Sequence, residues 1–239
     1  MSDAVKVGFV PFSAAPRGIL VVWDCAHAVG SINLDFDANG VDLAVGCTYK
    51  YGNSGPGSPA WLFVRKELQN TLQVPIQGWF AQGDQFAMGP VFEPADSIRR
   101  YQIASPSIIG LRSVKVAFDM IAEAGIDAIE AKAGMGTELM IQLFDAWLAP
   151  LGFRLGTPRD ATWRGGHITL HHPDAQKIAA AMRTISNVVP DFRMPDGIRL
   201  AMSPLPTSYC EVWDGFARLR DLVQSGAYLT ITDNGSRVT

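Results

Sequence analysis

The 239-residue sequence lacks several features that would assign a protein to a class at once. It has no excess of positive charge, since 20 Lys and Arg stand against 23 Asp and Glu, which argues against a nucleic-acid-binding protein. No apolar run approaches the roughly 18–20 residues that a membrane-spanning helix needs. The start, MSDAVKVGFV, does not have the pattern of a secretory signal. We therefore expect a cytoplasmic protein with neither a membrane nor a nucleic-acid partner.

Cysteine is also scarce. Cys25, Cys47 and Cys210 are odd in number and show no CxxC spacing, which predicts buried, reduced thiols rather than a disulfide framework. The histidines of HITLHH have no matching set of carboxylates or cysteines, so we expect no metal site. Internal repeats and low-complexity segments are absent as well.

What is present is an ordinary globular composition, 48% hydrophobic and 18% charged. Three short apolar runs at 19–24, 42–48 and 60–64 predict strands of one sheet, the first of them buried and parallel. After about residue 105 the apolar spacing becomes helical. It predicts helices over 107–124, 126–148, 174–186 and 214–224, with strands at 167–170 and 197–202.

Two polar residues follow the first two predicted strands. Asp24 ends the run ILVVWD, at the rim where α/β folds bind ligands, although a carboxylate there also caps turns. Lys50 follows DLAVGCT and is usually read as a solvated residue. Here it lies between two tyrosines and before the glycine-rich GNSGPG, a setting that suits a nucleophilic amine. A lysine and a carboxylate at consecutive strand ends suit pyridoxal phosphate (PLP), which needs the first for covalent attachment and the second for its ring nitrogen.

The segment VVWDCAHAVGSINLDFDANGVDLAVGCTYKYGNSGPGSPAWLFV resembles the kynureninase family, with its WD-x-x-H, GVD-x-AVGC and YKY-x-N-x-GPG-x-PA blocks in order. GWFAQGDQFAMGP, RGGHITL and GIRLAMSPL resemble three further blocks. The resemblance implies an α/β protein of PLP-dependent transferase fold type I. Residues 1–17 would be an unplaced leader, 18–107 a partial large PLP-binding domain and 108–239 an α+β C-terminal small domain.

The resemblance also implies roles for single residues. Lys50 would carry PLP and move protons, and Tyr49 would contact the cofactor phosphate and donate a proton during cleavage. Asp24 would pair with the pyridinium nitrogen, with His27 beside it. The remaining three act further away: Trp79 and Ser105 would reach the phosphate of the neighbouring subunit in a homodimer, and Arg199 would bind the substrate α-carboxylate.

The implied reaction is hydrolysis of the Cβ–Cγ bond of L-kynurenine or 3-hydroxykynurenine, giving an anthranilate and L-alanine in tryptophan catabolism, which leads to NAD biosynthesis. Members of the family have a large N-terminal part with no counterpart here, so we expect apolar surface and strand edges to be open. Two alternatives follow. The chain is a non-catalytic remnant that needs a partner chain, or it is another class-V PLP lyase such as a cysteine desulfurase.

Overall fold

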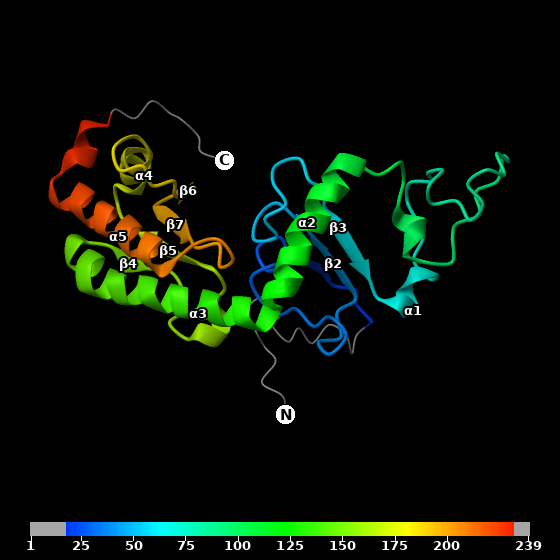
Figure 1. The fold of residues 1–239 in the computed structure, drawn as a ribbon, viewed down its shortest axis with the longest axis horizontal. Helices are drawn as coiled ribbons and strands as arrows, with labels where there is room; N and C mark the ends of the chain where they lie inside the picture. The colour runs from blue at the N-terminus through cyan, green and yellow to red at the C-terminus, as the bar shows by residue number, and fades with distance from the viewer. Residues whose placement is uncertain (1–17, 232–239) are drawn as a thin grey trace. The chain divides into compact units, whose positions relative to one another are not determined.

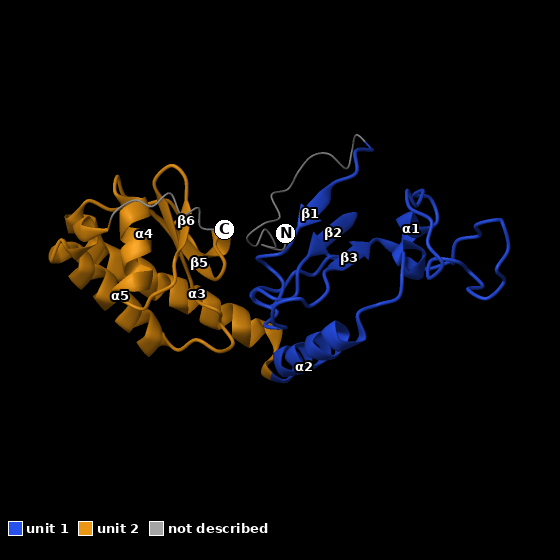
Figure 2. Cartoon of the chain, turned by 90° about the horizontal axis from the view of Figure 1, so that it is seen from above, with its two compact units in different colours: residues 1–4, 9–123 blue, residues 5–8, 124–239 orange. Residues whose placement is uncertain are grey.

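The computed structural model describes residues 18–231, which divide into two compact units (Figures 1 and 2). Unit 1 comprises residues 18–123 of this range and unit 2 comprises 124–231. The predicted boundary at 107/108 separates the large and small domains that the family resemblance implies. The division into compact units does not test this boundary, which stays a prediction. No helix in residues 18–231 is both long and apolar enough to cross a bilayer.

Unit 1 is built around the three predicted strands. β1 (Val22–Asp24) pairs in parallel with β2 (Leu43–Gly46), and β3 (Trp61–Val64) pairs antiparallel with β2, in the order β1-β2-β3. One face of this sheet carries a small core in which Cys25, Val41 and Ala44 are buried. The chain between β1 and β2 contributes Phe36 to this core, with its ring 4.7 Å from that of Phe63.

The opposite face of the same sheet is open. Side chains alternate between faces along a strand, and Val22, Val45 and Leu62 are exposed. The prediction of a buried first strand is wrong, because β1 is an edge strand of the described sheet and Ile19 and Leu20 are also exposed. An open apolar face of this kind was expected from the family resemblance.

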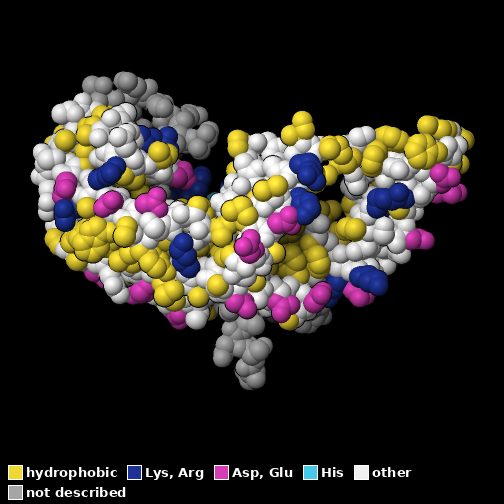
Figure 3. All heavy atoms as spheres, in the orientation of Figure 1, with side chains coloured by type: hydrophobic (Ala, Val, Ile, Leu, Met, Phe, Trp, Pro, Cys, Tyr) yellow, Lys and Arg dark blue, Asp and Glu magenta, His cyan; other side chains and the backbone are white. Residues whose placement is uncertain are grey.

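The rest of unit 1 is mostly irregular. The short helix α1 (Lys66–Gln69) precedes a long loop, a 3₁₀ turn (Ile98–Tyr101) and then α2 (Ile108–Ala124). The loop projects from the unit and carries apolar side chains on its surface (Figure 3), among them Phe86, Met88 and Val91.

Unit 2 is an α+β unit with a four-stranded antiparallel sheet in the order β4-β5-β7-β6. Its strands are β4 (Arg154–Leu155), β5 (His167–His171), β6 (Asp191–Arg193) and β7 (Gly197–Ala201). Its helices are α3 (Ile126–Leu143), α4 (Ala175–Thr184) and α5 (Tyr209–Gln224). The core between them includes the fully buried side chains of Leu148, Ile168, Leu170, Ile178, Met182, Ile198, Met202 and Leu219.

Most predicted elements of unit 2 are confirmed, with differences at their ends. The helix predicted over 126–148 is α-helical only to Leu143 and continues as a π-helical turn (Phe144–Leu148). The last helix begins at Tyr209 rather than residue 214, because Ser208 and Glu211 form a reciprocal capping box. Strands β4 and β6 were not predicted, since they span only two and three residues.

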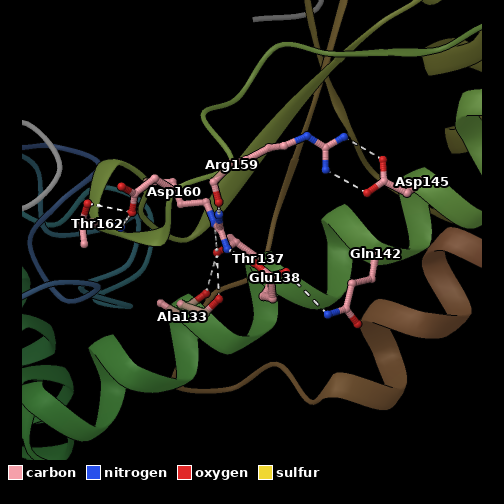
Figure 4. Close-up of polar contacts among 10 residues, drawn as sticks. Ala133, Thr137, Glu138, Gln142, Asp145, Arg159, Asp160 and Thr162 are labelled. Atoms are coloured by element: carbon pink, nitrogen blue, oxygen red, sulfur yellow. Dashed lines mark hydrogen bonds and ion pairs between the residues drawn. The ribbon is translucent and has the colours of Figure 1, made fainter.

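Charged side chains hold the connection from β4 to β5 against α3 and the π-helical turn that follows it (Figure 4). Arg159 makes a two-pronged ion pair with Asp145, at 2.7 and 2.8 Å. Arg164, which is buried, donates to Thr137 Oγ1 at 3.1 Å and pairs with Glu138. Because a buried guanidinium needs such partners, this cluster fixes where β5 enters the sheet.

Candidate functional site

The carboxyl ends of β1 and β2 bring four of the predicted site residues to one edge of the sheet, namely Asp24, His27, Tyr49 and Lys50. These strands are parallel neighbours, so the segments that follow them leave the sheet on the same side. The Lys50 Nζ atom lies 3.4 Å from Nδ1 of His27, and both side chains are partly buried. The ammonium also lies 6.0 Å from the centre of the Tyr49 ring, whose side chain is exposed.

Asp24 lies at the last position of β1, where the sequence placed it. Its Oδ1 accepts a hydrogen bond from the backbone N–H of Ala26 at 2.9 Å, so the carboxylate caps the following turn. The side chain remains exposed and able to receive a further donor. The capping interpretation and the ligand-binding one are therefore compatible at this residue.

The loop after Lys50 is closed by hydrogen bonds that the sequence did not single out. The Asn53 N–H donates to the Lys50 carbonyl at 3.0 Å, and the Ser54 N–H donates to the Thr48 carbonyl at 3.1 Å. Thr48 Oγ1 in turn lies 2.9 Å from Ser58 Oγ and 2.7 Å from the carbonyl oxygen of Pro59. The buried Thr48 thus ties both ends of the glycine-rich loop together and fixes the backbone at Lys50. The sequence feature that could have indicated this role is the position of Thr48, directly before Tyr49 and Lys50.

Gly30 supports the Lys50 loop from the turn that follows β1. It has φ of +80°, and a Cβ atom there would lie 2.4 Å from the Tyr51 carbonyl oxygen and 2.8 Å from the Gly52 nitrogen. These are backbone atoms, which cannot rotate away. Glycine is therefore required where the two loops meet.

Trp79 and Ser105 lie elsewhere in unit 1. Trp79 is half exposed, and its ring packs edge-on against Phe80 with centroids 4.7 Å apart. The backbone segments that carry Trp79 and Ser105 lie close together. A Cβ atom added to Gly78 would lie only 2.0 Å from the Ile103 carbonyl oxygen. Within residues 18–231, no hydrogen bond or ion pair joins either side chain to Lys50.

Arg199 belongs to unit 2, at the middle of β7. Its side chain is about one-fifth exposed and forms an ion pair with Asp191 of the neighbouring strand β6. The sequence analysis did not single out Asp191. The sequence feature that could have pointed to Asp191 is Arg193, two residues later in the segment DFR, shortly before the strand GIRLA.

The cysteines differ from one another in their surroundings. Cys25 is buried, Cys47 is partly buried and Cys210 is exposed, so the prediction of buried thiols is wrong for Cys210, which lies in the first turn of α5. Burial, with a smaller contribution from the negative charge of Asp24, raises the pKa of the Cys25 thiol to about 11. Cys25 is therefore protonated at neutral pH and is a poor nucleophile.

The raised pKa of Cys25 predicts a pH dependence. The pKa of the Cys25 thiol is about 11 in the folded chain, whereas that of an ordinary cysteine thiol is 9.0. Stability from this group is complete below pH 9.0 and is lost as the pH rises towards 11. We expect the free energy of unfolding to fall over this interval, and Cys25→Ala to flatten the fall. Urea unfolding across the interval measures it, and an equal slope in both proteins would contradict the assignment.

Comparison with known proteins places this geometry in a family. Residues 129–219 match the model of the kynureninase C-terminal domain. The chain is 35% identical over 206 residues to the kynureninase of Pseudomonas fluorescens, covering 86% of this chain and 49% of that protein. The chain thus spans about half the length of the curated relatives it matches.

Solved structures confirm the predicted fold. The apo cysteine desulfurase of Thermococcus onnurineus NA1 superposes with a TM-score of 0.73 at 18% identity, over 89% of this chain and 54% of that one. The C-DES protein with glycine covalently linked to its PLP cofactor gives a TM-score of 0.65 at 16% identity, over 81% and 49%. The fold is therefore that of the PLP-dependent enzymes of fold type I, here covering part of the neighbours' chains.

Proposed function

The chain belongs to the kynureninase family, and we propose on that basis that it takes part in hydrolytic Cβ–Cγ cleavage of L-kynurenine or 3-hydroxykynurenine, with PLP as cofactor and as a homodimer. The observation that carries the proposal is the Lys50 amine, held 3.4 Å from His27 at the ends of two parallel strands. The match to the Pseudomonas fluorescens kynureninase covers 206 of the 239 residues, a span long enough that it must include Lys50 and Arg199.

The residues at the strand ends fit PLP by their chemistry. A partly buried primary amine, an exposed carboxylate and a glycine-rich loop lie in one segment of unit 1. When bound, PLP withdraws electrons from the α-carbon of an amino acid and so allows bonds near that carbon to break. In the proposed arrangement Lys50 would hold the cofactor and Asp24 would keep its ring nitrogen protonated. Trp79 and Ser105 would contact the phosphate of the cofactor that the partner subunit binds.

The remaining steps belong to the chain's own side chains. Lys50 Nζ, once released, would take and return the proton of the substrate α-carbon, and His27 Nδ1 would hold the amine in place. Water would add to the γ-carbonyl of the substrate, and when the Cβ–Cγ bond breaks Cγ would leave in anthranilate. Tyr49, exposed beside Lys50, would donate its phenolic proton to Cβ, which becomes the methyl carbon of L-alanine. Arg199 would bind the α-carboxylate through its guanidinium, which suits a planar carboxylate better than an ammonium does.

The proposed activity is tested by incubating the purified chain with PLP and L-kynurenine and following the fluorescence of anthranilate. We expect anthranilate to accumulate with equal amounts of L-alanine, and a parallel assay with 3-hydroxykynurenine to show which substrate is preferred. Product formation without PLP, or none with PLP at any chain concentration, would contradict the proposal.

A second candidate, a non-catalytic member of the family that needs a partner chain, is favoured by the open face of the unit 1 sheet. Val22, Val45 and Leu62 expose an apolar surface beside the edge strand β1. This candidate predicts PLP binding and turnover only after the partner is added. A cysteine desulfurase would need a mobile catalytic cysteine, whereas Cys25 is buried, Cys47 directly follows β2 and Cys210 lies in the first turn of α5.

A further inference from the structure

Asp191 and Arg199 form a pair across two strands of the unit 2 sheet. The two residues are directly opposite one another in the antiparallel register of β6 and β7, which places their side chains on one face. Their closest contact joins Arg199 Nη2 to Asp191 Oδ2. The two side chains are similarly shielded, with exposed fractions of 22% and 24%.

Arg193 pairs with the same oxygen of this carboxylate. Its Nε and Nη2 atoms lie 2.9 and 2.8 Å from Asp191 Oδ2, and its side chain is 57% exposed. One carboxylate thus stands between two guanidinium groups, and the three side chains together carry one net positive charge. A second carboxylate, supplied by a ligand, would complete the neutralisation.

We propose that Asp191 is a positioning residue, which orients the Arg199 guanidinium for the carboxylate of an amino-acid ligand. The inference rests on the proposed role of Arg199 as the α-carboxylate clamp and adds the residue that holds this clamp. An arginine side chain has several rotatable bonds, and fixing it before binding removes an entropic cost. Asp191 supplies this constraint through a charge-assisted hydrogen bond, and Arg193 keeps Asp191 in place.

The first test is Asp191→Asn, which keeps the size of the side chain and removes its charge. We expect this substitution to weaken L-kynurenine binding by about tenfold. Binding is measured by calorimetry on the full chain with PLP present, with every variant made in a Tyr49→Phe background that blocks the proposed turnover. Arg199→Gln should weaken binding at least as much. The double variant should be no weaker than Arg199→Gln alone, because Asp191 acts through Arg199. Additive losses, or tighter binding in Asp191→Asn, would overturn the inference.

Asp196→Asn is the matched control. Asp196 precedes β7, forms an ion pair with Arg154 at 3.1 Å and is hydrogen-bonded to His171 at 2.9 Å, but in the part of the chain that the structure describes no hydrogen bond or ion pair joins its side chain to Arg199. We expect Asp196→Asn to leave L-kynurenine binding unchanged within about twofold. An equal loss in both variants would mean that any loosening of the β6–β7 connection weakens binding, and the inference would fail.

A second measurement needs no ligand, and it separates this inference from the proposed function. NMR of the chain with ¹⁵N-labelled arginine reports rotation of the Arg199 guanidinium, whose signal is assigned from Arg199→Lys. We expect slow rotation in the wild type and in Asp196→Asn, and fast rotation in Asp191→Asn. A chain that binds no L-kynurenine yet shows this pattern contradicts the proposed function alone. Equal rotation in the wild type and Asp191→Asn contradicts the positioning role.

Discussion

Replacing Lys50 with alanine is expected to abolish covalent attachment of PLP to the chain. The amine of Lys50 is partly buried, is 3.4 Å from His27 and lies on a loop whose ends are tied by Thr48. Alanine removes the Nζ atom that would form the bond and keeps the hydrogen bonds of Thr48 that fix the loop. The wild type should develop a visible absorption band on titration with PLP, and Lys50→Ala should develop none. The same variant should produce no anthranilate.

Lys66→Ala provides the control for this experiment. Lys66 is exposed in α1 and lies outside the loop that carries Lys50. Because PLP reacts slowly with any exposed amine, a band that persists in Lys50→Ala and falls in Lys66→Ala would reveal adventitious labelling. That outcome would contradict the assignment of Lys50.

Gly30→Ala is expected to produce the largest loss of stability near the site. A methyl group there would lie 2.4 Å from the Tyr51 carbonyl oxygen, and the backbone φ of +80° is itself unfavourable for alanine. We expect the free energy of unfolding to fall by about 3 kcal/mol, from the strained backbone and the overpacking together. Urea unfolding followed by tryptophan fluorescence measures the loss. Affinity for PLP should fall as well, because the clash pushes the loop beside Lys50.

Gly40→Ala separates the two causes. Gly40 also has a positive φ, +61°, but a Cβ atom there meets nothing within 4 Å. This variant should lose only about 1 kcal/mol and keep the PLP affinity of the wild type. Equal losses in Gly30→Ala and Gly40→Ala would show that contact with the Lys50 loop contributes nothing.

The sequence predicted the elements whose apolar pattern is long or regular. The helix over 107–124, the strand at 167–170 and the helix over 174–186 were found within a residue or two, because a buried face imposes its period on the sequence. The placement of Asp24 at the end of one strand and of Lys50 shortly after the next was also predictable. A polar residue that ends an apolar run marks a strand end, and the parallel pairing of β1 and β2 follows from the fold.

Contacts between distant residues were not predictable in this way. The pairing of Asp191 with Arg199 depends on the register of β6 and β7, and β6 is too short to leave a periodic pattern. The exposure of Val22 depends on which strands lie beside β1, which no local pattern records. Cys210 was expected to be buried, yet it is exposed in the first turn of α5. Predicting that this helix begins at Tyr209 required the capping box of Ser208 and Glu211 to be recognised.

The most direct test of the account identifies the lysine that PLP modifies. The chain is incubated with PLP, reduced with borohydride to make the bond permanent, digested and examined by peptide mass spectrometry. The account predicts one modified peptide, which contains Lys50, in an amount that approaches one PLP per chain. Modification spread over several exposed lysines, with Lys50 unmodified, would contradict the assignment of the cofactor site and with it the proposed function.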